Sequence, residues 1–223
     1  MRNSIPCLTC LLVLVLAFGV QSAVSHGADI DLYRPAPQIM SISEADWRTH
    51  VWRILPQTRD DLRKENSHPL NLQYAGTLAD LRTALAPMAW EPGTRLDWDT
   101  AIKLLSPSLP LQELPIIPHV HNGRHESLTL VKRAANEGRL VLRLWATPYR
   151  IEGTTSLWIG NVTAQHKRTI LELVALPATD PDTRSPLEFV QNDFSGLNPS
   201  RPLENGPLLL QAAPMRMSVH LQP

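Results

Sequence analysis

Three strand-forming runs separated by short turns constrain the fold of this 223-residue chain more than any other feature. The runs span residues 127–133, 139–149 and 156–165. Asn136-Glu137-Gly138 follows the first run and Glu152-Gly153-Thr154-Thr155 the second, and both read as turns. Because strands joined by short loops pair with their sequence neighbours in opposite directions, these runs predict an antiparallel sheet. In the second run Leu140, Leu142 and Leu144 share one face.

Two segments before these runs carry helix signals. Thr77 followed by Asp80 resembles a capping box, and Leu78, Leu81 and Leu85 then follow at helical spacing until Pro87 ends or kinks the helix. Asp97 is expected to cap a second short helix to about Leu105. That helix would bury the four residues Trp98, Ala101, Ile102 and Leu105. Between 107 and 118 four prolines predict an extended, stiff crossing.

A third helix is expected to begin at Ser185-Pro186-Leu187-Glu188, with Ser185 as the cap and Pro186 in the first helical position. Its apolar face would consist of Leu187, Val190 and Phe194. Further strands are expected at His50–Leu55, at Leu70–Tyr74 and, as a closing edge strand, at Met215–Leu221. The segment around Ile170–Val174 is expected to form either a further strand or the start of a helix. The predicted class is α+β. We expect a single domain in which a mostly antiparallel sheet has two or three short helices packed on one face.

The first 25 residues have the layout of a secretory signal peptide. Arg2 precedes a short apolar run, Leu11–Val20, and small residues follow at 21–25. The run is about half the ~20 residues that a transmembrane helix needs, so we expect an exported periplasmic or secreted protein with no transmembrane helix in the mature chain. The alternative is an inner-membrane protein anchored by an uncleaved N-terminus. Residues 26–46 read as a linker or extended arm, and 47–223 as the domain.

Composition excludes several classes of function. Lys and Arg total 21 and Asp and Glu total 21, so the chain lacks the basic excess that nucleic-acid binding needs. Cys7 and Cys10, the chain's two cysteines, both lie in the predicted leader. A mature chain without cysteine has no disulfide, no thiolate nucleophile and no cysteine-ligated zinc.

From Trp47 to about Leu221 the chain resembles the LssY C-terminal domain family of bacterial proteins. The resemblance rests on the order of short pieces: 69–76 (PLNLQYAG), Leu78-x-x-Leu81-x-x-x-Leu85, Leu114-Pro115, Gly123-Arg124, Leu128-x-Leu130, Arg143-Leu144-Trp145-x-x-Pro148 and Trp158-Ile159-Gly160. It implies a domain with no established reaction that is often appended to membrane-embedded modules, including ones similar to lipid phosphatases. We expect no such module in this chain, because no segment after the leader is apolar enough to span a bilayer.

The densest set of chemically active side chains is His119-x-His121-x-x-x-His125, with Arg124 and Glu126 beside it. In an extended segment His119 and His121 point the same way, about 7 Å apart, and an Asn122-Gly123 turn returns the chain toward them. Three imidazoles suit Zn²⁺, which would activate a water. Two other interpretations remain open: Arg124 holds a phosphate or carboxylate, or the histidines lie on an exposed loop without a specific role.

Arg143 and Trp145 share the face of their strand opposite Leu142 and Leu144. One interpretation is a platform that contacts an anionic ligand through Arg143. The other, which we favour, is that this face is covered by a loop or helix and that Trp145 belongs to the core. Trp158 is read as core in the same way, and Gly160 as a bulge or a close backbone approach.

No nucleophile-elbow motif and no mature cysteine support covalent catalysis. We therefore favour a non-enzymatic cell-envelope binding or accessory module, whose partner is a small anionic ligand or a membrane protein. A first alternative is a metal-dependent hydrolase of a phosphate- or acyl-bearing envelope substrate that uses His119, His121 and His125. A second is a membrane-anchored structural or assembly protein.

Overall fold

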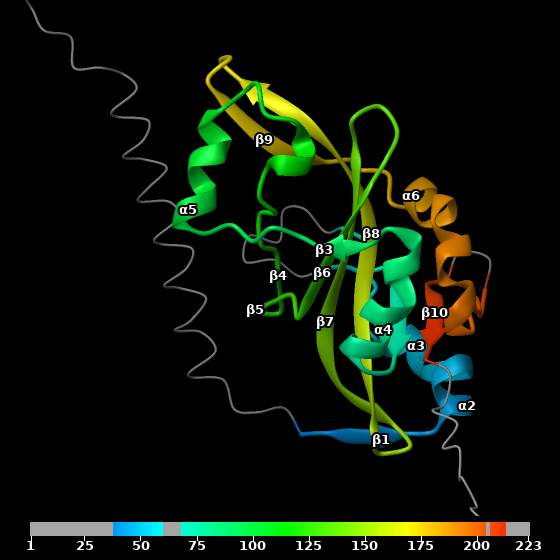
Figure 1. Ribbon diagram of the computed structural model, residues 1–223. Helices are drawn as coiled ribbons and strands as arrows, with labels where there is room; N and C mark the ends of the chain where they lie inside the picture. The colour runs from blue at the N-terminus through cyan, green and yellow to red at the C-terminus, as the bar shows by residue number, and fades with distance from the viewer. Residues whose placement is uncertain (1–37, 60–67, 204–205, 213–223) are drawn as a thin grey trace, which may run out of the picture.

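The computed structural model describes residues 38–59, 68–203 and 206–212 (Figure 1). Its main sheet has the strand order β10-β2-β8-β7-β6-β3, with β1 beside β7 and β9 beside β8. The strands are β1 Met40–Ile42, β2 Leu72–Ala75, β3 Glu91–Pro92, β6 Leu128–Arg133, β7 Arg139–Ile151, β8 Thr155–Ile170, β9 Val174–Thr179 and β10 Leu208–Gln211. A separate hairpin joins β4 (Val120–His121) to β5 (Arg124–His125). The α+β class and the mostly antiparallel sheet are confirmed.

The three predicted runs form the centre of the sheet as β6, β7 and β8, each antiparallel to the next. The prediction of a strand or a helix start around Ile170–Val174 is wrong. β8 continues to Ile170, the chain turns, and Val174 begins β9 opposite Ile170. β1 and β10 are parallel to their partners, β7 and β2.

The prediction of a strand at His50–Leu55 is also wrong, because this segment is helical. It consists of α2 (Glu44–Asp46), a π-helical turn η1 (Trp47–Val51) and α3 (Trp52–Ile54). The side chain of Ser43 accepts a hydrogen bond from the Asp46 N–H and so caps the first turn. The π turn places Trp47 and Trp52, both buried, on the same side of the helix. Tertiary burial of two indoles therefore overrides the strand-like local composition.

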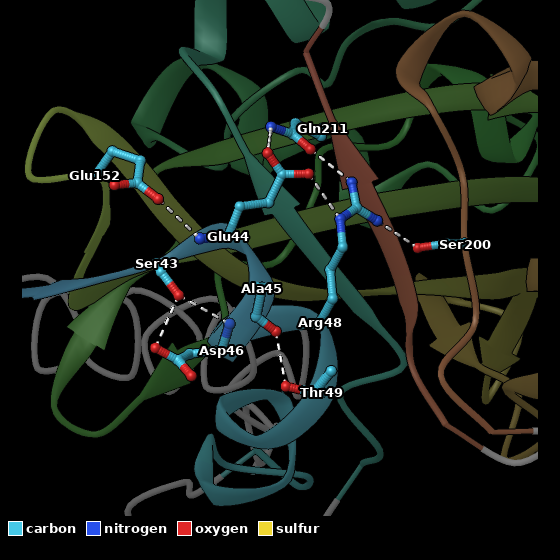
Figure 2. Close-up of polar contacts among 9 residues, drawn as sticks. All are labelled: Ser43, Glu44, Ala45, Asp46, Arg48, Thr49, Glu152, Ser200 and Gln211. Carbon is cyan, nitrogen blue, oxygen red and sulfur yellow. Dashed lines mark hydrogen bonds and ion pairs between the residues drawn. The ribbon is translucent and has the colours of Figure 1, made fainter.

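Polar contacts from Arg48 fix this helical segment to distant parts of the chain (Figure 2). Its Nε donates to Glu44 Oε1 at 2.9 Å, its Nη1 to Ser200 Oγ, and its Nη2 to Gln211 Oε1. Gln211 Nε2 in turn donates to the other Glu44 carboxylate oxygen. These bonds lower the pKa of Glu44 and connect α2 and η1 to β10.

The remaining helical elements are α4 (Leu78–Leu85), η2 (Ala86–Met88), α5 (Trp98–Ala101), η3 (Ile102–Leu105), η4 (Leu111–Glu113), α6 (Arg184–Phe189) and η5 (Gln191–Leu197). Thr77 caps α4 as predicted, and its hydroxyl accepts the Asp80 N–H. Asp97 caps α5, also as predicted, and Thr100 completes a capping box that was not predicted.

The predicted inward face of α5 is partly wrong. Trp98 and Ile102 are 57% and 68% exposed, and Leu104 is buried instead. The helix tightens to 3-10 geometry at Ile102, which changes the spacing of the residues that face inward. In α6 the capping atom is also different from the prediction: Asp182 accepts from the N–H groups of Arg184 and Ser185. The inward face of Leu187, Val190 and Phe194 is confirmed.

Alternating side chains give the sheet two buried faces. Leu72 and Tyr74 of β2 and Leu142 of β7 belong to a core that also contains α4, α6 and η5 residues. The opposite face packs Trp145 and Ile159 against Trp47, Trp52 and Leu55 of the N-terminal helical segment. Helices thus cover both faces of the sheet, so the predicted packing of helices on one face alone is wrong. No helix in the described residues is both long and apolar enough for a membrane span.

Two predictions fall outside the described residues, the leader at 1–25 and the edge strand at 215–221. The domain boundary at residue 47 stays a prediction. β1 and α2 lie just before it, within the stretch read from sequence as a linker or extended arm.

Candidate anion site on the polar half of the sheet

One half of the second sheet face carries buried polar side chains in place of the apolar ones. Beyond Trp145 and Ile159, the same face presents five buried polar residues: Arg139, Arg143, Asn161, Thr163 and Gln165. Arg143 lies opposite Asn161 across β7 and β8, and Arg139 opposite Gln165. Such groups are stable away from water only if they have hydrogen-bond partners.

Arg139 has a full set of partners. Its Nε donates to Gln165 Oε1 at 2.9 Å, and its Nη1 donates to the carbonyl oxygens of Leu111 and Leu114 at 2.9 and 2.7 Å. Its Nη2 donates to the Pro115 carbonyl at 3.3 Å. This guanidinium therefore attaches the proline-rich crossing to the sheet.

Arg143 is different, although it is 0% exposed. Its Nη1 makes one long hydrogen bond, 3.4 Å to Thr163 Oγ1. Its Nε and Nη2, and the neighbouring Asn161 Oδ1, have no hydrogen-bond partner among the described residues. Burial lowers the pKa of Arg143 from 12.5 to about 10, with Glu126 acting to raise it and Arg59 to lower it. The side chain is still a cation at neutral pH.

The chain around β4 and β5 brings further polar groups to this half of the face. Arg59 Nη1 donates to the Val120 carbonyl at 3.0 Å, and the His121 ring meets the Trp145 ring edge-on at 6.0 Å. Glu126 accepts the His119 N–H at 2.9 Å and the Thr129 hydroxyl at 3.3 Å.

His119 is held in its neutral form. Burial, together with the smaller effects of the charges of Arg143, Arg59 and His68, lowers its pKa from 6.5 to about 2. We call Arg59, His119, Glu126, Arg143 and Asn161 the arginine cluster. Two of these five side chains are guanidinium cations and one is a carboxylate.

The β4–β5 register separates the predicted histidine set. His121 pairs with Arg124, and Val120 pairs with His125. Because paired residues share a face of the hairpin, His121 and Arg124 are on one side and His125, which is exposed, is on the other. Among the residues that the structure describes, no three or more His, Cys, Asp or Glu side chains are grouped as a metal site would require. The residues present therefore do not fit a three-histidine zinc site.

Of the residues predicted for a site, the structure places His119 and Arg143 together, with His121 nearby on Trp145. The favoured interpretation of Arg143 and Trp145 as a covered face is confirmed by their burial. Sequence reasoning missed Arg59 and Asn161. Asn161 and Thr163 alternate with apolar residues in the third run, which is a usable signal, whereas no local signal places Arg59 here.

The comparisons with known proteins give one match. A family model described as LssY C-terminus matches residues 52–196, which contain every member of the arginine cluster. Neither the curated proteins nor the solved structures contain a match to this chain.

Proposed function

We propose that this chain, which belongs to the LssY C-terminus family, is a binding module that holds a small anion against Arg143. The proposal does not include catalysis. The observation that carries it is the pair of unpartnered nitrogens, Nε and Nη2, on a guanidinium fully excluded from solvent.

These two nitrogens point along one edge of the guanidinium plane. That edge is the one that receives a carboxylate or phosphate through two parallel N–H···O bonds. A buried cation without such bonds is costly to the fold, and a bound anion removes that cost. The neutral imidazole of His119 and the free acceptor Asn161 Oδ1 add polar contacts for a ligand that carries an O–H group, as a protonated phosphate does.

Ligand entry requires movement of the chain over Arg143, because that side chain has no exposed surface in this structure. The segment with His119 and His121 is the part we expect to move. It is held by the Arg59 bond to Val120 and by the His121–Trp145 contact.

The leader pattern of residues 1–25 supports a place for this module in the cell envelope, periplasmic or secreted. There we infer an accessory role, in which the bound anion is a small envelope solute or an acidic group of a membrane protein.

Thermal unfolding in phosphate, with ionic strength held constant by chloride, tests the proposal. We expect phosphate to raise the Tm of the wild type in a saturable way and to leave the Tm of Arg143→Met unchanged. Arg133→Met removes an exposed arginine of β6 and is the matched control, which should respond like the wild type. Equal responses of Arg143→Met and the wild type, or no response of the wild type to phosphate or acetate, would contradict the proposal.

A further inference from the structure

The turn between β8 and β9 is built from unfavourable residues. Four turns in the described chain contain consecutive positions with positive φ: Asn122-Gly123, Asn136-Glu137, Glu152-Gly153 and Leu171-Glu172. Three of them use Asn or Gly, which tolerate this conformation. Leu171 and Glu172, with φ of 50° and 56°, have neither advantage. A bulky side chain held in this region indicates a requirement other than folding.

The side chains at this turn are also apolar and exposed. Leu171 is 76% exposed, and its neighbours Ile170 and Leu173 are 41% and 47% exposed. The Leu173 N–H donates to the Ile170 carbonyl at 3.0 Å, so the turn itself is closed. We call Ile170, Leu171 and Leu173 the apolar tip. Its apolar side chains are exposed to water and its backbone at Leu171 has a positive φ, and both features cost free energy in the isolated protein.

A second exposed apolar pair lies on the element beside this hairpin. Trp98 of α5 and Ile102 of η3 are 57% and 68% exposed, and η3 contacts β9. Leu104 of η3 and Ala175 of β9 share a small buried cluster that holds the two elements together. Figure 1 shows the β8–β9 hairpin projecting from one end of the molecule, with α5 and η3 next to it.

We propose that the apolar tip, with Trp98 and Ile102, inserts into the surface of a lipid bilayer. The tip ends a hairpin that projects from the molecule (Figure 1), which suits immersion in a bilayer interface more than docking into a flat protein surface. Arg168, exposed on β8, is three residues before Leu171, about 10 Å along the strand. An apolar group inserted ~5–10 Å deep would therefore place Arg168 at the level of the lipid headgroups. An exposed Trp, such as Trp98 on the neighbouring α5, is typical of this interface.

Glu172 limits the depth of insertion. It is exposed within the turn, and its carboxylate disfavours full burial in hydrocarbon. The inferred contact is therefore peripheral and reversible. It is independent of the anion proposed at Arg143, which lies elsewhere on the sheet.

Co-sedimentation of the full chain with vesicles of phosphatidylcholine, with and without phosphatidylglycerol, tests this inference. The key variant is L171N/E172G, which replaces the turn with Asn-Gly. We expect it to lower the partition coefficient at least about tenfold, because one largely exposed Leu is lost from the insertion. We also expect a higher Tm, since Asn-Gly suits this turn. Trp98→Ala should lower partitioning independently.

Phe189→Ser is the matched control, because Phe189 is 69% exposed on α6, away from the hairpin. It should partition like the wild type. All variants keep the same N-terminal residues, so differences in partitioning between them come from the substituted side chains. Three results would overturn the inference: equal partitioning of L171N/E172G and the wild type, a lower Tm in that variant, or a wild-type dimer that the variant abolishes, which would make a second copy the occupant.

Discussion

Arg139 and Arg143 lie on the same face of β7, both shielded from solvent, but only in Arg139 does every guanidinium nitrogen have a hydrogen-bond partner among the described residues. Four residues, or two repeats of the pleat, separate a structural arginine from one whose Nε and Nη2 have no hydrogen-bond partner among the described residues. Because local sequence and burial are so similar, the difference comes from what the rest of the chain places over each side chain.

This contrast predicts opposite effects of the same substitution. Arg143→Met removes a buried charge that has little compensation, so we expect it to raise the free energy of unfolding of the ligand-free protein by about 1–3 kcal/mol. Arg139→Met removes the guanidinium hydrogen bonds to three carbonyl groups and Gln165, and should lower it by about 3 kcal/mol or more. Urea unfolding in chloride buffer measures both. A loss of stability in Arg143→Met equal to that in Arg139→Met would show that Arg143 is a structural residue.

His119 predicts a specific pH dependence of stability. Its pKa is about 2 in the folded protein and about 6.5 when unfolded, so between these values the unfolded chain binds one more proton. Stability therefore falls as the pH falls through this window. Between about pH 6.5 and pH 5 the wild type should lose up to about 2 kcal/mol that His119→Gln does not lose. The exposed His125, changed to Gln, serves as the control and should keep the wild-type slope in urea titrations.

Gly160 is predicted to tolerate no side chain. A Cβ at this position would collide with the Arg143 carbonyl oxygen and with Leu144 Cδ2, so the sequence-based prediction of a close approach holds. We expect Gly160→Ala to cost about 3 kcal/mol or more, since neither β7 nor β8 can move without disturbing the sheet centre. At Gly196 a Cβ meets no atom within 4 Å, and Gly196→Ala should change stability by no more than about 1 kcal/mol. Thermal unfolding of the two variants compares them directly, and equal shifts would refute the argument.

Arg48 is predicted to attach the N-terminal helical segment to β10. Arg48→Met removes its bonds to Glu44, Ser200 and Gln211 and should cost about 1–3 kcal/mol. Arg53 is a matched control, because Arg48 and Arg53 each lie over a tryptophan ring, at 5.2 and 5.1 Å. Arg53→Met should cost no more than about 1 kcal/mol, the value of an exposed cation–π contact. Chemical denaturation would contradict this role if both variants lost the same stability.

The candidate site was only partly predictable. The period-two alternation of the second run put Arg143 and Trp145 on one face, and the Asn122-Gly123 turn was correctly placed. The predicted grouping of His119, His121 and His125 does not form in the β4–β5 hairpin. Its two-residue turn pairs His121 with Arg124, so His125 lies on the opposite face of the hairpin from His121. Arg59 is 61 residues before Val120 in the sequence, and only tertiary packing brings the two into contact.

The sequence by itself determined the elements whose signals are local. These are the three central strands, the capped helices after Thr77 and Asp97, and the close approach at Gly160. Only the tertiary structure decided which buried polar groups are satisfied, that residues 50–54 are helical, and that Trp98 is exposed. The physical reason is the distance along the sequence over which each interaction acts. Capping, turns and pleat alternation depend on a few neighbouring residues, whereas the partners of a buried guanidinium come from distant segments of the chain.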